Sequence, residues 1–218
     1  MVPWTTLATA DTPEGRLELR QRGKHDFLIV IGGRVLMASA SRSSEEQLAT
    51  RALAEVAAPS PRVLIGGLGM GFTLRAALDA LPATAKVTVA ELDPTIVAWC
   101  NGPLAPATKH AVGDRRVTLQ LGDVAAVIAA AAPGAYHAIV LDLYEGPNAA
   151  SQARDDPFYG PTALARTRAA LAAGGVLGVW SEDADAPFAK RLAAARFAVT
   201  THRIGTGGRR HVIYLGRR

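Results

Sequence analysis

The stretch Pro61-Arg-Val-Leu-Ile-Gly-Gly-Leu-Gly-Met-Gly-Phe-Thr-Leu-Arg75 decides the fold of this chain. A short run of Val63, Leu64 and Ile65 gives way to alternating glycines, and an apolar helical pattern begins at Phe72. This order predicts a strand, a tight turn and a helix, the opening unit of a nucleotide-binding α/β domain. Glycines suit such a turn because they adopt unusual backbone angles and let a ligand or a helix approach the main chain.

A glutamate at the end of the next apolar run supports this prediction. Glu91 follows Gly71 by 20 residues and closes the run Val87-Thr-Val-Ala. An acid at the tip of the second strand is where the hydroxyls of a ribose would be bound. The alternatives are that Glu91 is a solvated strand end and that the glycines are purely architectural.

Composition limits the class of protein. The chain has 218 residues, of which 49% are hydrophobic and 20% charged, as is typical of a globular α/β domain. No apolar run approaches the roughly 18 residues of a membrane span, and we expect no signal peptide because charged residues interrupt the first thirty positions. The single cysteine, Cys100, lies in an apolar stretch, so we expect a buried thiol and a cytoplasmic protein.

The net charge of +5 comes largely from arginines near the C-terminus. Basic patches can bind nucleic acid, but this one has no interleaved aromatic residues and no recognised nucleic-acid module accompanies it. A solvated face is the expected role of these arginines. We therefore expect neither nucleic acid nor a membrane as a partner.

The first part of the chain has a strand pattern of its own. Residues 16–20 alternate, residues 27–31 form a second apolar run, and Gly32-Gly33 would turn the chain into a third. This predicts a small antiparallel β meander. We place the domain boundary after it, with a β-rich region over residues 1–42 and an α/β domain over residues 43–218.

A helix is expected to open the α/β domain. Ser43 with Glu46, or Ser44 with Gln47, has the spacing of a capping box at a helix start. Beyond this helix, strand and helix patterns alternate, which predicts a parallel sheet with right-handed crossovers. The expected strands lie near residues 62–66, 86–91, 117–121, 137–142, 175–180, 197–203 and 210–215, and the expected helices near residues 72–81, 94–100, 123–131, 161–172 and 185–194.

The last two expected strands break this alternation. Only a short segment around Gly207 separates them, so they should form an antiparallel hairpin. A parallel sheet closed by such a hairpin resembles the fold of S-adenosylmethionine-dependent methyltransferases. The expected fold class is therefore α/β, with a Rossmann-like seven-stranded sheet and a small N-terminal β meander.

Acidic residues follow further strands of the predicted sheet. Asp123 comes after the third strand, in Leu-Gly-Asp-Val, and Asp142 comes after the fourth, in Leu-Asp-Leu-Tyr-Glu-Gly-Pro. In open parallel sheets the ligand lies beyond the carboxyl ends of the strands, so these side chains should gather with Glu91 and the glycine loop. Capping of the next helix is the alternative role of Asp123.

Together these motifs resemble the aminopropyltransferase family of spermidine synthase and its relatives, over nearly the whole chain. Gly66–Arg75 is similar to the glycine loop of that family, Glu91 to its ribose-binding acid and Gly122-Asp123 to its adenine-binding pair. Asp142-Leu-Tyr-Glu145 resembles an Asp-Ser-Ser-Asp segment followed by Gly-Pro. The resemblance implies cofactor contacts from Gly67, Leu68, Gly69, Gly71, Glu91, Leu92, Asp123 and Val124, catalytic roles for Asp142 and Glu145, and substrate contacts from Tyr144 and Glu46.

This resemblance implies a function. The expected reaction transfers an aminopropyl group from decarboxylated S-adenosylmethionine to a diamine, with Glu145 as base, no metal, and a homodimer associated through the N-terminal region. Two alternatives stay open. Gly69 stands where the family has an amine-holding aspartate, which favours methyl transfer from intact S-adenosylmethionine to a small molecule. A non-catalytic nucleoside-binding homologue is the other.

Overall fold

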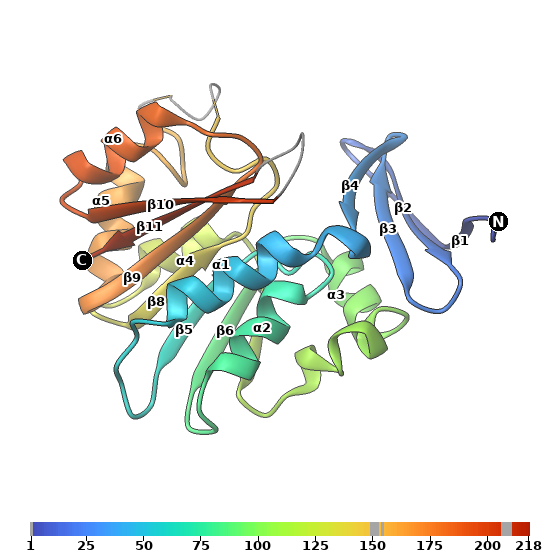
Figure 1. Cartoon of the computed structure of the whole chain (residues 1–218), viewed down its shortest axis with the longest axis horizontal. Coiled ribbons are helices and arrows are strands. Elements are labelled where there is room, and N and C mark those ends of the chain that lie inside the picture. The colour runs from blue at the N-terminus through green and yellow to red at the C-terminus, as the bar shows by residue number, and fades with distance from the viewer. Residues whose placement is uncertain (1, 149–152, 154, 206–210) are drawn as a thin grey trace.

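The computed structural model describes residues 2–148, 153, 155–205 and 211–218, and shows two separate sheets (Figure 1). The larger sheet has seven strands in the order β10-β11-β9-β8-β5-β6-β7. The smaller has four, β1 to β4 in chain order, and stands at one end of the molecule. In the part of the chain that the structure describes, no helix is long and apolar enough to span a bilayer.

The small sheet is the predicted antiparallel meander with one strand more. Its strands are β1 (Thr5–Thr12), β2 (Gly15–Arg22), β3 (Asp26–Ile31) and β4 (Arg34–Ala38). Gly32 and Gly33 form the tight β3–β4 turn with φ of +53° and +83°, values that disfavour any side chain. The sheet turns one apolar face, including Leu19 and Ile29, into the main core of the protein. The domain boundary placed after residue 42 stays a prediction.

Helix α1 (Ser43–Leu53) connects the two sheets, and its N-terminus differs from the expectation. The predicted capping box is wrong, because Arg42 is the N-cap residue and no side chain caps the helix. Gln47 instead donates a hydrogen bond to Oγ of Ser43 over 3.1 Å. One face of α1 is buried and packs on strand β9, where Gly178 leaves room for Ala52.

The seven-stranded sheet confirms the predicted fold class. Strands β9, β8, β5, β6 and β7 are parallel, and β11 runs antiparallel between β9 and β10. Thr201 pairs with Tyr214 in the terminal hairpin, as predicted, and the turn at residues 206–210 lies outside the described residues. The strands are β5 (Arg62–Gly66), β6 (Lys86–Glu91), β7 (Val117–Leu121), β8 (Tyr136–Leu141), β9 (Leu171–Ser181), β10 (Ala198–Ile204) and β11 (His211–Arg217).

Helices cover both faces of this sheet. Alternate residues of β5 enter different cores, with Val63 and Ile65 on one side and Leu64 on the other, as expected of a strand buried on both faces. One core includes residues of α1, α2 (Phe72–Ala80) and α3 (Pro94–Asn101), and the second includes residues of α4 (Val124–Ala130), α5 (Pro161–Ala170) and α6 (Ala186–Ala194). Short 3₁₀ helices are η1 (Ser39–Ser41), η2 (Ala105–Thr108) and η3 (Ala111–Gly113).

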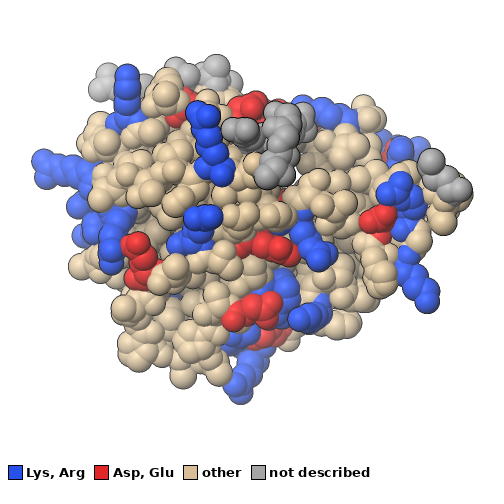
Figure 2. Space-filling model, viewed as in Figure 1, with Lys and Arg blue, Asp and Glu red and all other residues tan. Residues whose placement is uncertain are grey.

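The environment of Cys100 agrees with the expectation from the sequence. The thiol of Cys100 is buried, as predicted, and burial raises its pKa to about 12. It contacts the carbonyl oxygen of Gly69 over 3.2 Å. Figure 2 shows Lys and Arg side chains scattered over the visible face, with acidic side chains among them.

Candidate functional site

Glu91 binds the main chain of the glycine loop and thereby joins the ends of β5 and β6. Its Oε2 accepts a hydrogen bond from the amide of Leu68 and its Oε1 accepts one from the amide of Asp93, each over 2.8 Å. The side chain is 9% exposed. Because each carboxylate oxygen has two lone pairs, both oxygens retain an acceptor site for the two hydroxyls of a ribose. Glu91 thus holds the two strand ends together and has acceptor positions left for a ligand.

The three alternating glycines have different surroundings. Gly67 has φ of +88°, and a Cβ placed there would lie 2.3 Å from the carbonyl oxygen of Asp142. Gly69 has φ of +50°, and its Cβ would lie 2.7 Å from Sδ of Met37, which comes from the small sheet. Gly71 is the N-cap of α2 with φ of +83°. The loop therefore lies between the tip of β8 and strand β4.

The ends of β6 and β7 expose two large apolar side chains. Leu92 is 72% exposed and Leu121 is 58% exposed, each next to a strand end. Exposed leucines at the edge where ligands bind offer apolar surface for a flat base. Sequence reasoning missed Leu121, which gave no signal beyond its place before Gly122.

Asp123 and Val124, the other predicted cofactor contacts, have structural roles. Oδ1 of Asp123 accepts a hydrogen bond from the amide of Ala125 over 2.8 Å and so caps α4. This is the alternative role considered for Asp123. The side chain of Val124 is buried against Gly66 in the second core. Their contacts with a cofactor stay predictions.

Asp142 lies immediately beyond the tip of β8, facing the first turns of α1 and α2. Its Oδ2 accepts a hydrogen bond from the hydroxyl of Thr73 over 2.5 Å, and this hydroxyl lies 3.5 Å from the carbonyl oxygen of Glu45. Burial, together with the negative charge of Glu45, raises the pKa of Asp142 to about 7. Burial also raises the pKa of Glu45, whose Oε2 accepts a hydrogen bond from Ser44 over 2.5 Å. The two carboxyl groups therefore compete for ionisation, since the negative charge of one disfavours that of the other.

Tyr144 and Glu145 lie in the loop that follows Asp142. Oε2 of Glu145 accepts a hydrogen bond from the side-chain amide of Asn148 over 3.1 Å, and its Oε1 lies 3.4 Å from Nη1 of Arg34. The guanidinium of Arg34 also lies over the ring of Tyr144, with 4.9 Å between Cζ and the ring centre. Tyr144 is 48% exposed. Arg34 was missed from the sequence, because no local pattern links residues 111 positions apart.

Glu46 does not join Asp142. Its carboxylate forms an ion pair of 3.0 Å with Nε of Arg42, and almost half of its side chain is exposed. The neighbouring Glu45 is the buried acid that interacts with Asp142. The sequence offered both glutamates in the same helical turn, and the structure brings Glu45, not Glu46, to the site.

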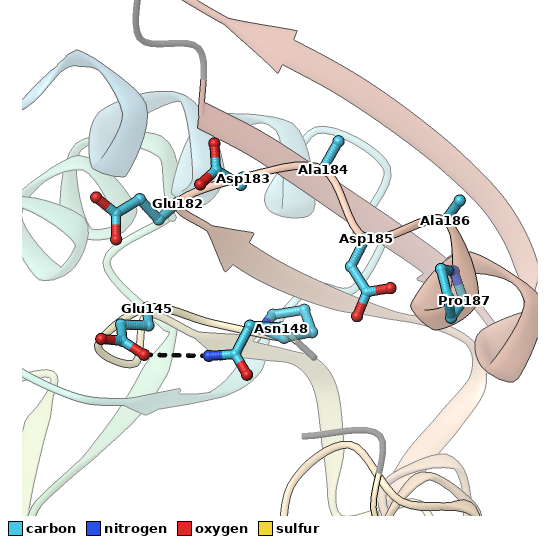
Figure 3. A pocket seen from close by; sticks show the side chains of 9 residues that line it. Glu145, Asn148, Glu182, Asp183, Ala184, Asp185, Ala186 and Pro187 are labelled. Atoms are coloured by element: carbon cyan, nitrogen blue, oxygen red, sulfur yellow. Dashed lines mark hydrogen bonds between the residues drawn. The ribbon is translucent and has the colours of Figure 1, made fainter. Parts of the chain in front are cut away.

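A cavity of about 540 Å³ lies next to Glu145 (Figure 3). The loop after β8 forms one wall, and the segment after β9 forms the other together with the first residues of α6. Four of its lining side chains are carboxylates and none of the described ones is Lys or Arg. Sequence reasoning missed the acids of the second wall, since they follow a strand without a familiar motif. The lining residues are Glu145, Pro147, Asn148, Glu182, Asp183, Ala184, Asp185, Ala186 and Pro187.

Comparison with known proteins was made by sequence and by structure. No protein-family model matches the chain. Putrescine N-methyltransferase 1 of Nicotiana tabacum is 36% identical over 126 residues, which are 57% of this chain and 32% of that protein. The same-named protein of Nicotiana attenuata is also 36% identical over 126 residues and matches over 31% of its length. The matched region thus spans about a third of these curated relatives.

Solved structures match nearly the whole chain. Spermidine synthase from Thermotoga maritima superposes with a TM-score of 0.77 at 17% identity, over 97% of this chain and 72% of that one. A spermidine synthase in complex with the transition-state analogue AdoDATO gives 0.76 at 16% identity with the same coverage. A probable spermidine synthase from Corynebacterium glutamicum gives 0.68 at 18% identity, over 96% of this chain and 79% of that one. The chain is therefore spermidine synthase-like in its fold, and over 126 residues its sequence is related to that of the putrescine N-methyltransferases.

Proposed function

We propose that the chain transfers an aminopropyl group from decarboxylated S-adenosylmethionine to a diamine. The observation that carries this proposal is the carboxyl group of Asp142, whose pKa is raised to about 7 beside the glycine loop. An amine attacks carbon only after losing its proton, and a base is most effective when its pKa is near the working pH. A carboxylate of ordinary acidity would be a weaker base.

The donor would bind across the ends of β5, β6 and β7. Glu91 has acceptor positions left for the ribose hydroxyls, and Leu92 and Leu121 offer apolar surface to the adenine. The bound donor supplies a sulfonium group with an electrophilic carbon. Asp142 is within reach of that region because its own carbonyl oxygen packs against Gly67 of the loop.

Asp142 and Glu145 have different proposed roles in the reaction of the acceptor. The bond between the amine nitrogen and the donor carbon forms as the bond from that carbon to sulfur breaks, and the sulfur leaves as a neutral thioether. Before this attack, the ammonium form of the acceptor gives one proton to the carboxylate of Asp142, which leaves the neutral amine as the nucleophile. Glu145, held by Arg34 and Asn148, attracts the cationic acceptor. Both predicted catalytic acids thus keep a role, with the proton transfer assigned to Asp142.

Methyl transfer to a diamine is the second candidate. The curated relatives are putrescine N-methyltransferases by name. In addition, the side chain of Met37 occupies the space next to Gly69, so the loop offers no carboxylate to a donor amine at this position. Both observations favour intact S-adenosylmethionine over its decarboxylated form.

A transfer assay distinguishes these candidates. Purified protein is incubated with decarboxylated or intact S-adenosylmethionine and a panel of diamines, and the products are identified by mass spectrometry. Aminopropylated product supports the main proposal, whereas methylated product from intact donor alone replaces it with methyl transfer. Absence of both, together with binding of methylthioadenosine, would identify a non-catalytic binding protein.

Replacement of Glu91 tests the donor site without any turnover. We expect Glu91→Ala to weaken the binding of methylthioadenosine by about 1–3 kcal/mol, because charge-assisted hydrogen bonds to the ribose are lost. Glu91→Gln retains the shape and one acceptor oxygen but places its NH₂ against one of the two main-chain amides, so it should recover only part of the affinity. Calorimetric titration measures both variants. An affinity equal to that of the wild type in Glu91→Ala would remove Glu91 from the donor site.

Two further properties belong to this proposal. A cytoplasmic location agrees with the single buried cysteine. A homodimer agrees with the exposed apolar side chains of Leu7 and Val35 on the small sheet. Both stay predictions.

A further inference from the structure

Arg34 connects the small sheet to the loop that carries the candidate catalytic acids. It is the first residue of β4, directly after the Gly32-Gly33 turn. Its guanidinium contacts two successive residues of that loop, the ring of Tyr144 and the carboxylate of Glu145. A planar cation suits this arrangement, since one face can stack on an aromatic ring while its edge binds a carboxylate.

The segment that Arg34 contacts has an unusual backbone. Glu145 has φ of +60°, a left-handed conformation that is uncommon for residues other than glycine. Gly146, with φ of +66°, lies so close to β9 that an added Cβ would be 2.2 Å from the carbonyl oxygen of Trp180. The carbonyl of Glu145 accepts a hydrogen bond from the amide of Glu182 over 3.1 Å. The main chain at 145–146 is thus fixed on the side of β9.

The side chains of this segment are fixed from the other side. Asn148, in the same loop, holds one carboxylate oxygen of Glu145, while Arg34 approaches the second oxygen from a different sheet. Both partners of the ion pair are partly exposed, with 58% of the Arg34 side chain and 40% of the Glu145 side chain accessible. Solvent therefore screens the pair, and its contribution to overall stability is small. Its effect should instead be on orientation at the site.

We propose that Arg34 is a positioning residue that fixes Tyr144 and Glu145 beside the acceptor-binding region. This assignment rests on the proposed function, because it acts through residues that would bind the acceptor. It also gives the small sheet a role in the reaction, since the only contacts described for the Arg34 side chain are with this loop. The site would consequently be built from both sheets.

Arg22 provides a matched control for this proposal. It lies in the same small sheet, its side chain is 39% exposed, and it too combines an ion pair with a stacked aromatic ring. Its partners, Asp26 and Trp4, belong to the small sheet itself or to the segment before it. Arg22→Ala therefore removes the same kinds of interaction without touching the loop.

The experiment compares Arg34→Ala, Arg34→Lys and Arg22→Ala with the wild type. For Arg34→Ala we expect kcat/KM for the acceptor to fall by roughly tenfold through misplaced side chains, with unchanged affinity for methylthioadenosine and an unchanged unfolding midpoint. Arg34→Lys keeps the charge without the planar fork, so it should recover part of the loss. Arg22→Ala should match the wild type in kcat/KM.

Hydrogen exchange of residues 141–148 supplies a readout that needs no reaction. We expect faster exchange of this segment in Arg34→Ala than in the wild type or in Arg22→Ala. Equal exchange in all three, or equal losses of kcat/KM in Arg34→Ala and Arg22→Ala, would overturn the positioning role. If the wild type transfers no group from either donor, the proposed function fails on its own, and hydrogen exchange still decides whether Arg34 orders the loop.

Discussion

The Asp142→Asn variant should lose turnover by roughly 10²–10⁴-fold, the usual contribution of a positioned general base. The amide of asparagine has nearly the shape of the carboxyl group and can still accept a hydrogen bond from Thr73, so the fold should persist. It cannot take a proton from an ammonium. Initial rates with each sulfonium donor, measured with saturating acceptor, check this expectation. Turnover like that of the wild type would exclude Asp142 as the proton acceptor.

The pH dependence gives this prediction a second signature. Wild-type kcat should rise as the pH passes through about 7, because the carboxylate form of Asp142 is the active one. Burial is the larger cause of the raised pKa and the charge of Glu45 is the next. Glu45→Gln removes that charge, so the rise should move to lower pH. An unmoved profile in Glu45→Gln would show that the two carboxyl groups do not interact.

The same pKa shift affects stability in a defined direction. Between the ordinary pKa of an aspartate, about 4, and the raised value of about 7, the folded protein binds more protons at Asp142 than the unfolded chain does. The free energy of unfolding contributed by this group therefore decreases as the pH rises through that window. Urea unfolding at several pH values should show a smaller decrease in Asp142→Asn than in the wild type.

Gly67→Ala is expected to damage both the fold and the site. An added Cβ would lie 2.3 Å from the carbonyl oxygen of Asp142, and the residue would have to keep φ of +88°. Neither main-chain segment can easily move apart from the other, because the amide of Asp142 donates a hydrogen bond to the carbonyl oxygen of Gly66. The amide of Gly67 likewise donates one to the carbonyl oxygen of Ala90. Overpacking and left-handed strain together should cost about 2–4 kcal/mol of unfolding free energy.

Two other glycines supply graded controls for this substitution. In Gly69→Ala the Cβ would meet the flexible side chain of Met37, so the main cost is the left-handed backbone, about 1 kcal/mol. In Gly113→Ala the Cβ would meet nothing within 4 Å, and little change is expected. Urea midpoints measured at constant pH test this order. Equal stability of the three variants would contradict the close contact at Gly67.

The core sheet could be predicted from sequence because its strands are short apolar runs with clear boundaries. The predicted bounds of β5, β6 and β7 agree with the structure, since glycine, proline or charged residues flank each run. Strand β1 was missed because the segment Thr5–Thr12 is largely exposed and has only Ala8, Ala10 and Thr12 on its half-buried face. Strand β9 begins at Leu171, earlier than predicted, but its pairing with β8 is interrupted, because Tyr136 pairs with Leu171 and Ala138 with Val176, and Gly174 between them has φ of +72°.

The candidate site was predictable where a residue's role follows from its place on the sheet. Glu91 ends β6 and Asp142 directly follows β8, and topology alone brings them to one edge of the parallel sheet. Glu45 and Arg34 come from outside that pattern. The rotation of α1 selects Glu45 over its neighbour, and the turn at Gly32-Gly33 places Arg34 on a loop far along the chain. The positions of both side chains depend on packing between elements, which no local sequence pattern indicates.

The acidic cavity beside Glu145 bears on how fast a cationic acceptor would arrive. The chain carries a net charge of +5, so a diamine at long range is repelled. Close to the cavity, the carboxylates of Glu145, Glu182, Asp183 and Asp185 add negative charge, which Arg34 beside Glu145 and Arg191 beside Asp185 balance in part. Added salt weakens the distant repulsion and the nearby attraction together. Association rates of diamines should consequently depend far less on ionic strength than the charge of the cavity alone suggests. The shape of the cavity, rather than long-range electrostatic steering, would then govern how a diamine binds.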